Sequence, residues 1–205
     1  MEKIEWMMKL QRSFYIRDSV TMIAQELLGK YIFTFEDGKL TGGIITETEA
    51  YAGITDKASH AFSNRRTNRT EIMFSEGGVA YVYLCYGIHH LFNFVTGNKN
   101  VPDAVLLRGI LPVEGIEIME MRMGRKMKIK GFSDGPGKVS KVLNINITCT
   151  GQSLTGKRIW AEDRGLKIPD SNILKLPRVG VDYAGKDALL PYRFLIKDNS
   201  TIKPA

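Results

Sequence analysis

The sequence predicts one α+β domain in which strands pair as antiparallel hairpins. An Asp37-Gly38 turn signal separates two strand-like segments, which is typical of a hairpin. Apolar residues at helical spacing precede this hairpin, and the later elements do not follow the regular strand–helix–strand order of a parallel sheet. At 205 residues, the chain fits a single domain over 1–205, with no linker and with 198–205 read as a frayed tail.

The first predicted elements are a capped helix and the hairpin. Asp18 or Ser19 can cap the helix, and Gly29 ends it. The hairpin comprises 31–35 and 40–51, joined by Glu36-Asp37-Gly38-Lys39. Five apolar residues share one face of the helix, which we interpret as structural: Val20, Ile23, Ala24, Leu27 and Leu28.

The rest of the chain predicts shorter elements. After an arginine-containing loop come a tyrosine-rich strand and the apolar strand Ala104–Leu107. Pro112 can open a helix, because proline is favoured at the first helical position. A second short helix follows the loop 133–138. Three strands close the chain, around 159–161, 178–181 and 193–196.

The composition favours a polyanionic partner. The chain carries 29 Lys and Arg against 22 Asp and Glu, which gives a net charge of +7 and a pI near 9.4. One basic run contains Arg65, Arg66 and Arg69, and another extends from Arg122 to Lys130. Either run can neutralise phosphates and release counterions. A solvated basic face explains each run equally well.

Membrane and disulfide-rich classes do not fit the sequence. No window approaches the roughly 18–20 apolar residues of a membrane span, and the N-terminus has no apolar run of signal-peptide length. Cys85 and Cys149 are the only cysteines, so a disulfide framework or a four-cysteine metal site cannot form. We expect a soluble intracellular protein in a reducing compartment, with no membrane partner.

The segment 81–93 is unusually rich in polar-tipped rings. It contains three tyrosines, two histidines and an asparagine. Side chains alternate along a strand, so Tyr81, Tyr83 and Cys85 share one side and Tyr86 lies on the other. One side is predicted to be core and the other a platform for a flat ligand. In a basic chain that ligand is first a nucleobase, since stacking on an aromatic ring is worth about 1–3 kcal/mol per base.

Two carboxylates and a ring converge at the end of the second hairpin strand. Alternation places Glu47, Glu49 and Tyr51 on a common face. If both carboxylates share a desolvated site, their repulsion raises one pKa and makes that group a plausible general base. His60 follows nine residues after Tyr51. A lone histidine there is more often a hydrogen-bonded structural residue than a functional one.

Several short motifs follow one another along the chain: Glu47-Thr48-Glu49-Ala50-Tyr51, Asp56-Lys57-Ala58-Ser59-His60-Ala61, Arg65-Arg66-Thr67-Asn68-Arg69-Thr70, Tyr81-Val82-Tyr83, Tyr86-Gly87, Asn93 and Gly135-Pro136-Gly137-Lys138. In order and spacing, they resemble the alkyladenine (3-methyladenine) DNA glycosylase family. The similarity runs from Phe14 to Phe194. It implies one compact α+β domain around a curved antiparallel β-sheet flanked by helices, with a positively charged face for duplex DNA.

The resemblance implies base-excision repair chemistry centred on Glu49. Glu49 matches the family carboxylate that activates the water attacking the sugar C1′. Arg108 matches a position near that water and the backbone of the flipped nucleotide. The glycosidic bond of an alkylated purine cleaves through an oxocarbenium-like state, which an anionic carboxylate stabilises. The implied enzyme requires no metal or other cofactor. We expect a monofunctional hydrolase, because no lysine stands beside Glu49 in the sequence to act as the nucleophile of a lyase step.

The resemblance also implies how the damaged base is held. Flipping a base out of the duplex costs a few kcal/mol, and a cationic alkylated purine gains about 0.5–2 kcal/mol from facing aromatic rings. Five positions match residues with these tasks: Tyr51, Tyr83 and His60 as walls of the base pocket, Tyr86 as the side chain that wedges into the duplex, and Asn93 as a gate against purines with an amino group at C2.

The implied partner is double-stranded DNA carrying alkylated purines of the 3-methyladenine or 7-methylguanine type, with no obligatory protein partner. Four residues are predicted to contact its backbone: Arg65, Arg66, Arg69 and Lys138. For Lys138, a simple turn before a helix is an equal alternative. The roles of Glu47, His89 and His90 stay open, as does substrate breadth. We expect a monomer, cytoplasmic and nucleoid-associated in a bacterium or nuclear in a eukaryote.

Two other classes explain part of the sequence. A catalytically silent binder of damaged or single-stranded nucleic acid would use the same stacking platform, but it gives Glu49 no task. A metal-dependent nuclease would use four residues as ligands around a divalent ion: Glu47, Glu49, Asp56 and His60. Activity that resists EDTA would eliminate the nuclease. Neither class needs the full set of tyrosines together with Asn93, so both rank below the glycosylase.

Overall fold

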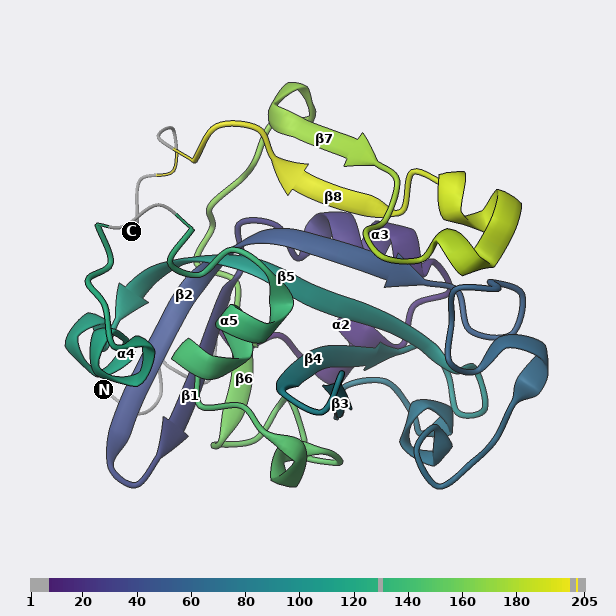
Figure 1. Cartoon of the computed structure of the whole chain (residues 1–205), viewed down its shortest axis with the longest axis horizontal. Coiled ribbons are helices and arrows are strands. Elements are labelled where there is room, and N and C mark those ends of the chain that lie inside the picture. The colour runs from purple at the N-terminus through teal and green to yellow at the C-terminus, as the bar shows by residue number, and fades with distance from the viewer. Residues whose placement is uncertain (1–7, 129–130, 200–201, 203–205) are drawn as a thin grey trace.

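The computed structural model describes residues 8–128, 131–199 and 202, and it confirms the predicted α+β class. Within these residues, eight strands form one sheet in which every pair is antiparallel. The main path has the order β3-β4-β5-β2-β1-β6, and β8 pairs with both β2 and β7. Figure 1 shows the two longest strands, β2 and β5, curving together across the molecule.

The N-terminal half folds largely as the sequence predicts. A short helix, α2 (Arg12–Tyr15), precedes α3 (Val20–Glu26), whose N-cap Ser19 accepts a hydrogen bond from the Met22 backbone N–H at 3.3 Å. All five apolar residues of the predicted helical face are buried. The hairpin strands are β1 (Tyr31–Glu36) and β2 (Lys39–Tyr51). Asp37 and Gly38 join them with positive φ angles of 51° and 71°, as a two-residue hairpin turn requires.

The tyrosine-rich segment is a hairpin, whereas the sequence predicts one strand. β3 (Ala80–Cys85) and β4 (His89–Thr96) pair antiparallel, with Tyr83 opposite Leu91. Tyr86 and Gly87 form the turn, with φ angles of 50° and 73°. Tyr86 therefore does not lie on a strand face, and this prediction is wrong. The turn escapes sequence inspection because tyrosine is uncommon at a left-handed position, where Asn, Asp or Gly is typical.

The prediction that Pro112 opens a helix is also wrong. Pro112 lies inside β5 (Asp103–Glu114), and the helix α4 (Ile116–Met123) begins after Gly115. A strand tolerates proline where its ladder is interrupted. The pairing of β2 with β5 shifts register at this point, and β4 pairs with β5 only over 103–106. The second helix, α5 (Pro136–Val142), follows the loop as predicted.

The C-terminal part contains two of the three predicted strands. β6 (Ile159–Glu162) and β8 (Arg193–Ile196) are present, but 178–181 is a loop and the remaining strand is β7 (Ile173–Leu176). Of the expected frayed tail, 200–201 and 203–205 lie outside the described residues, whereas Ile202 is buried in the main core. Five 3-10 helices complete the described elements: η1 (Phe62–Asn64), η2 (Glu71–Phe74), η3 (Ile147–Cys149), η4 (Asp170–Asn172) and η5 (Asp182–Leu189).

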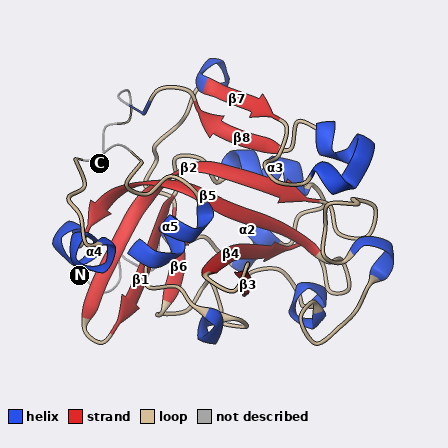
Figure 2. Cartoon of the chain, in the orientation of Figure 1, coloured by secondary structure: helices blue, strands red, loops and turns tan. Residues whose placement is uncertain are grey.

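The core positions the hairpin and the loops around one end of β2. The main hydrophobic cluster joins the sheet to α3 and α5, and Figure 2 shows these short helices lying against the strands. Two smaller clusters fix the loops that follow β2: one packs Ala61 and Met73 against Tyr81, and the other packs Ala58 against Val181. No helix in the described part of the chain is long and apolar enough to cross a membrane.

Candidate active site

A cavity of about 500 Å³ opens beside the end of β2, between the β3–β4 hairpin, β5 and the loop after β7. Its volume falls within the range typical of small-molecule sites, about 300–1,000 Å³, and a purine fits easily. Seven of the residues predicted from the sequence line it: Tyr51, His60, Arg69, Tyr83, Tyr86, Asn93 and Arg108. The fold therefore gathers side chains from four separate segments around one space.

Glu49 lies against this cavity and is fully buried. The Val179 backbone N–H donates to its Oε1 at 2.8 Å, and the Tyr51 hydroxyl donates to its Oε2 at 2.9 Å. The Arg108 Nε lies 3.4 Å from Oε1. All three partners line the cavity. Burial raises the pKa of Glu49, and Arg108, the Val179 N–H and the Tyr51 hydroxyl counteract this rise.

An irregular stretch of the sheet aims Arg108 at the carboxylates. Ile45 pairs with Ile110 and Glu47 with Gly109, but Thr48 pairs with Leu107, so Arg108 has no partner residue on β2. Such bulges redirect side chains and occur often beside active sites. The Arg108 Nε donates to Glu47 Oε1 at 2.8 Å. Glu47 thus holds the guanidinium, and both carboxylates predicted to converge do lie around it.

His60 sits in a ring-lined wall and is neutral. Its Nε2 lies 3.2 Å from the Arg69 guanidinium, which can only donate, so Nε2 accepts. The proton is then on Nδ1, which contacts the Tyr81 hydroxyl at 2.9 Å. Burial, together with the charges of Arg69 and Arg65, lowers the pKa of His60 to about 4. Its ring meets Tyr83 edge-on at 4.7 Å between centroids, and the Arg69 guanidinium covers the Tyr83 ring at 4.8 Å.

Asn93 and Tyr86 belong to the same hairpin but differ in exposure to solvent. Asn93 is buried, and its amide nitrogen donates to the backbone oxygens of Tyr81 and Leu91 at 3.2 and 3.4 Å. Its carbonyl oxygen is therefore the polar atom that it can offer to the cavity. Tyr86 is 91% exposed at the turn. An aromatic ring this exposed gains nothing from the folded core, which favours a partner outside the protein.

The predicted DNA-backbone residues do not form one group. Arg69 lines the cavity, whereas Arg66 pairs with Glu71 through two hydrogen bonds of 2.7 and 2.6 Å. The Lys138 Nζ donates to the Gly131 carbonyl at 3.0 Å. Arg65 is exposed. The structure places Arg69 at the cavity and gives Arg66 and Lys138 partners within the protein.

Sequence inspection missed the contribution of the loop after β7. Arg178 is buried and pairs with Asp56, Val179 supplies the N–H bonded to Glu49, and Tyr183 lines the cavity. A backbone N–H donor cannot be recognised from the residue type, because every residue except proline has one. Pro177 and Gly180 flank the segment and could have marked it as a loop.

The ligand set of the nuclease alternative is not assembled. Asp56 bonds to Arg178 and to the backbone N–H groups of Ala52 and Ala58. Among the residues that the structure describes, no three His, Cys, Asp or Glu side chains lie close enough together to hold a metal ion. Glu47 and Glu49 instead pair with Arg108, and Asp56 pairs with Arg178.

Comparison with known proteins gives a consistent result. Residues 13–200 match the family model described as methylpurine-DNA glycosylase. A protein of Chlamydia felis named "Putative 3-methyladenine DNA glycosylase" is 46% identical over 188 residues, which cover 91% of this chain and 95% of that protein. Proteins with the same name in Clostridium perfringens (strain 13 / Type A) and Bacillus cytotoxicus are 41% and 39% identical, each over 95% of this chain and at least 98% of their own length.

Proposed function

Because the chain belongs to the methylpurine-DNA glycosylase family, we propose that it excises 3-methyladenine and related alkylated purines from duplex DNA by hydrolysing the N-glycosidic bond. The membership confirms the resemblance carried by the sequence motifs and the enzyme class that it implies. One observation supports the proposal most strongly. The buried carboxylate of Glu49 accepts hydrogen bonds from the Val179 N–H and the Tyr51 hydroxyl and pairs with Arg108, and these three residues line an aromatic cavity large enough for a purine.

The damaged base enters this cavity after it leaves the duplex. Tyr51, Tyr83 and His60 supply ring surfaces, and cationic alkylated purines gain about 0.5–2 kcal/mol from such surfaces relative to neutral bases. A neutral His60 adds no repulsion toward a cationic base, which agrees with its lowered pKa. Tyr86 enters the duplex and fills the gap, since its ring is 91% exposed at a turn. The Asn93 carboxamide disfavours purines that carry an amino group at C2.

In the proposed hydrolysis, Glu49 acts as the general base and Arg108 as the charged residue that positions it. Water attacks C1′, the C1′–N bond breaks with its electron pair going to the purine, and Glu49 takes the proton of the water. The ionised carboxylate also stabilises the oxocarbenium-like state. Arg108, held by Glu47 at 2.8 Å, orients the carboxylate and the nucleotide backbone. The products are a free neutral base and an abasic sugar, with no covalent intermediate and no strand cleavage.

The test uses purified protein, methylated duplex DNA and EDTA. We expect release of free 3-methyladenine and a strand that breaks only after alkali treatment. Strand cleavage that requires a divalent ion and occurs without base release would contradict the proposal in favour of the nuclease, and strand cleavage that follows base release before alkali treatment would contradict the monofunctional reaction. Tight binding to the same duplex without base release would identify a silent binder.

A further inference from the structure

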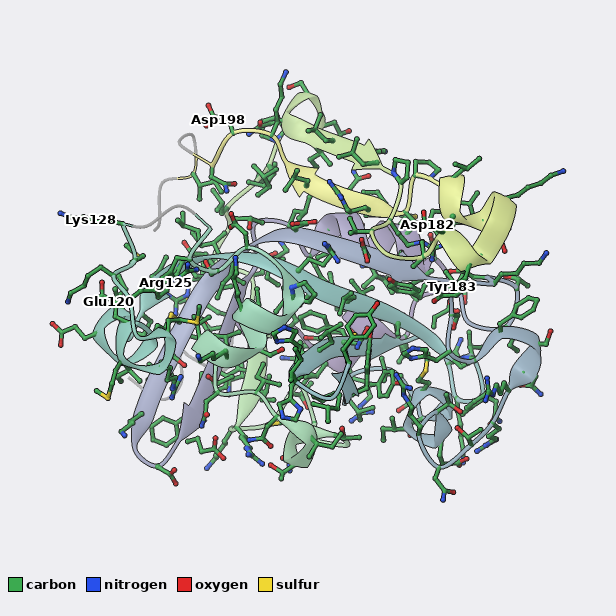
Figure 3. The ribbon with its side chains drawn as sticks, in the orientation of Figure 1. Glu120, Arg125, Lys128, Asp182, Tyr183 and Asp198 are labelled. Atoms are coloured by element: carbon green, nitrogen blue, oxygen red, sulfur yellow. The ribbon has the colours of Figure 1, made fainter. Side chains whose placement is uncertain are left out.

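Tyr183 is a large, exposed side chain at the cavity that the proposed function leaves without a task. It lies on η5, and its side chain lines the cavity that Tyr51 and Tyr83 also line. It is 71% exposed. Figure 3 shows Tyr183 beside Asp182, where this C-terminal segment comes close to the end of β2. Its ring therefore stands at the mouth of the cavity.

The ring is exposed but fixed. The Tyr183 hydroxyl donates to the Ala58 carbonyl at 3.1 Å. The segment that carries it is fastened to the same loop, because the Lys57 backbone N–H donates to an Asp187 carboxylate oxygen at 2.9 Å and Ala184 is buried against Ala58. A surface ring held in this way loses little conformational entropy when a ligand covers it.

The mouth of the cavity thus has two aromatic rims from distant parts of the chain. Tyr86 comes from the β3–β4 turn and Tyr183 from η5, and both line the cavity. When a base occupies the cavity, the deoxyribose joining it to the strand must pass this mouth.

We propose that Tyr183 is a substrate-contacting residue whose ring packs against the deoxyribose of the extruded nucleotide and retains that nucleotide in the cavity. The inference rests on the proposed function. The sugar is the part in question because the proposed function assigns the base to Tyr51, Tyr83 and His60, which are less exposed than Tyr183. The apolar face of a ring gains free energy by covering the carbon-bound hydrogens of a sugar. Tyr183 thereby favours the flipped state.

The test compares Tyr183→Ala with Tyr183→Phe and with the control Leu189→Ala. Leu189 is 74% exposed on the same segment and does not line the cavity. Two quantities are measured: the single-turnover rate of base release from methylated duplex, and the Kd for a duplex carrying one abasic-site analogue, which keeps a sugar but has no base. We expect Tyr183→Ala to lower the rate at least tenfold and to raise this Kd at least fivefold. Tyr183→Phe and Leu189→Ala should stay within threefold of wild type.

Each result decides the inference. A Tyr183→Ala variant that matches Leu189→Ala in both measurements overturns it, and so does a slower rate with an unchanged Kd for the abasic duplex. Equal losses in Tyr183→Phe and Tyr183→Ala would assign the effect to the hydroxyl bond with Ala58 and overturn the ring contact. If the wild type releases no base, the proposed function fails, while the Kd comparison on the abasic duplex still tests the contact of Tyr183 with DNA.

Discussion

Two buried carboxylates seven residues apart, Glu49 and Asp56, each bind an arginine, yet their surroundings differ. Asp56 receives both guanidinium nitrogens of Arg178 and two backbone N–H groups, at 3.2 and 2.9 Å. Arg178 is itself sealed, with no exposed side-chain surface. The contact of Glu49 with Arg108 is longer, at 3.4 Å, because the Arg108 Nε donates its hydrogen bond to Glu47 at 2.8 Å. We call the Asp56 site saturated because, among the described residues, Asp56 accepts four hydrogen bonds, whereas Glu49 accepts two.

This difference distinguishes an ion pair that stabilises the fold, Asp56 with Arg178, from one proposed to act in the reaction, Glu49 with Arg108. Arg178 also donates to the Ala50 carbonyl at 3.0 Å and to the Asp187 carbonyl at 3.0 Å, so the pair ties β2 to the loop after β7. The next residue, Val179, then presents its N–H to Glu49. The saturated site therefore fixes the geometry of the reactive one. Burial leaves Glu49 with a raised pKa, which is the direction expected of a general base.

Replacing Glu49 should have the largest effect on activity. Glu49→Gln keeps the shape but removes the base and the negative charge, and loss of a general base costs about 10²–10⁴ in rate. We expect at least a hundredfold slower single-turnover base release, with the Kd for damaged duplex within a few-fold of wild type. The urea midpoint should not fall, because a neutral amide replaces a carboxyl group that burial disfavours when ionised. Unchanged release would remove Glu49 from the reaction.

Breaking the saturated pair should instead cost stability. Asp56→Asn leaves the Arg178 charge buried without its counter-ion, and breaking a buried pair from one side costs about 3–5 kcal/mol. Urea unfolding measures this loss. The control is Glu71→Gln, which removes an exposed ion pair with Arg66, and such pairs are worth about 0–1 kcal/mol. Equal losses in both variants would contradict the distinction between the two sites.

The same contrast marks how far the sequence alone could predict the site. Strand alternation places Glu47, Glu49 and Tyr51 on one face, and the structure brings the three side chains together as predicted. The capped helix α3 and the Asp37-Gly38 turn are equally local patterns, and both predictions are confirmed. These features depend on residues that are close in sequence, so the sequence alone is enough to predict them.

The missed features depend on contacts between distant segments. Arg178 meets Asp56 across 122 residues, and Val179 meets Glu49 across 130. Neither residue type predicts its partner, and the bond to Glu49 comes from the backbone. Pro112 is a related case, because it stands in β5 opposite Gly43 of β2, where the register of that pairing shifts. Such information appears only when the sheet is assembled.

Removing the cation beside Glu49 should shift the pH dependence. Arg108 lowers the pKa of Glu49, so Arg108→Gln should raise that pKa further. The ionised form does the work, and the rate therefore falls as the pH drops through this pKa. The acid limb of the single-turnover rate should move to higher pH in Arg108→Gln, together with a slower plateau. A limb that stays in place would mean that another group sets it.

Replacing Glu47 should have the smallest effect on the rate, and it should shift the acid limb in the direction opposite to Arg108→Gln. The Glu47 charge raises the pKa of Glu49, so Glu47→Gln should move the acid limb to lower pH. The amide oxygen can still accept from the Arg108 Nε, which keeps the guanidinium in place, and the plateau should stay within about tenfold of wild type. Opposite shifts in Glu47→Gln and Arg108→Gln would identify Glu49 as the titrating group. Shifts in the same direction would instead point to a displaced Arg108, and the limb would then report geometry rather than charge.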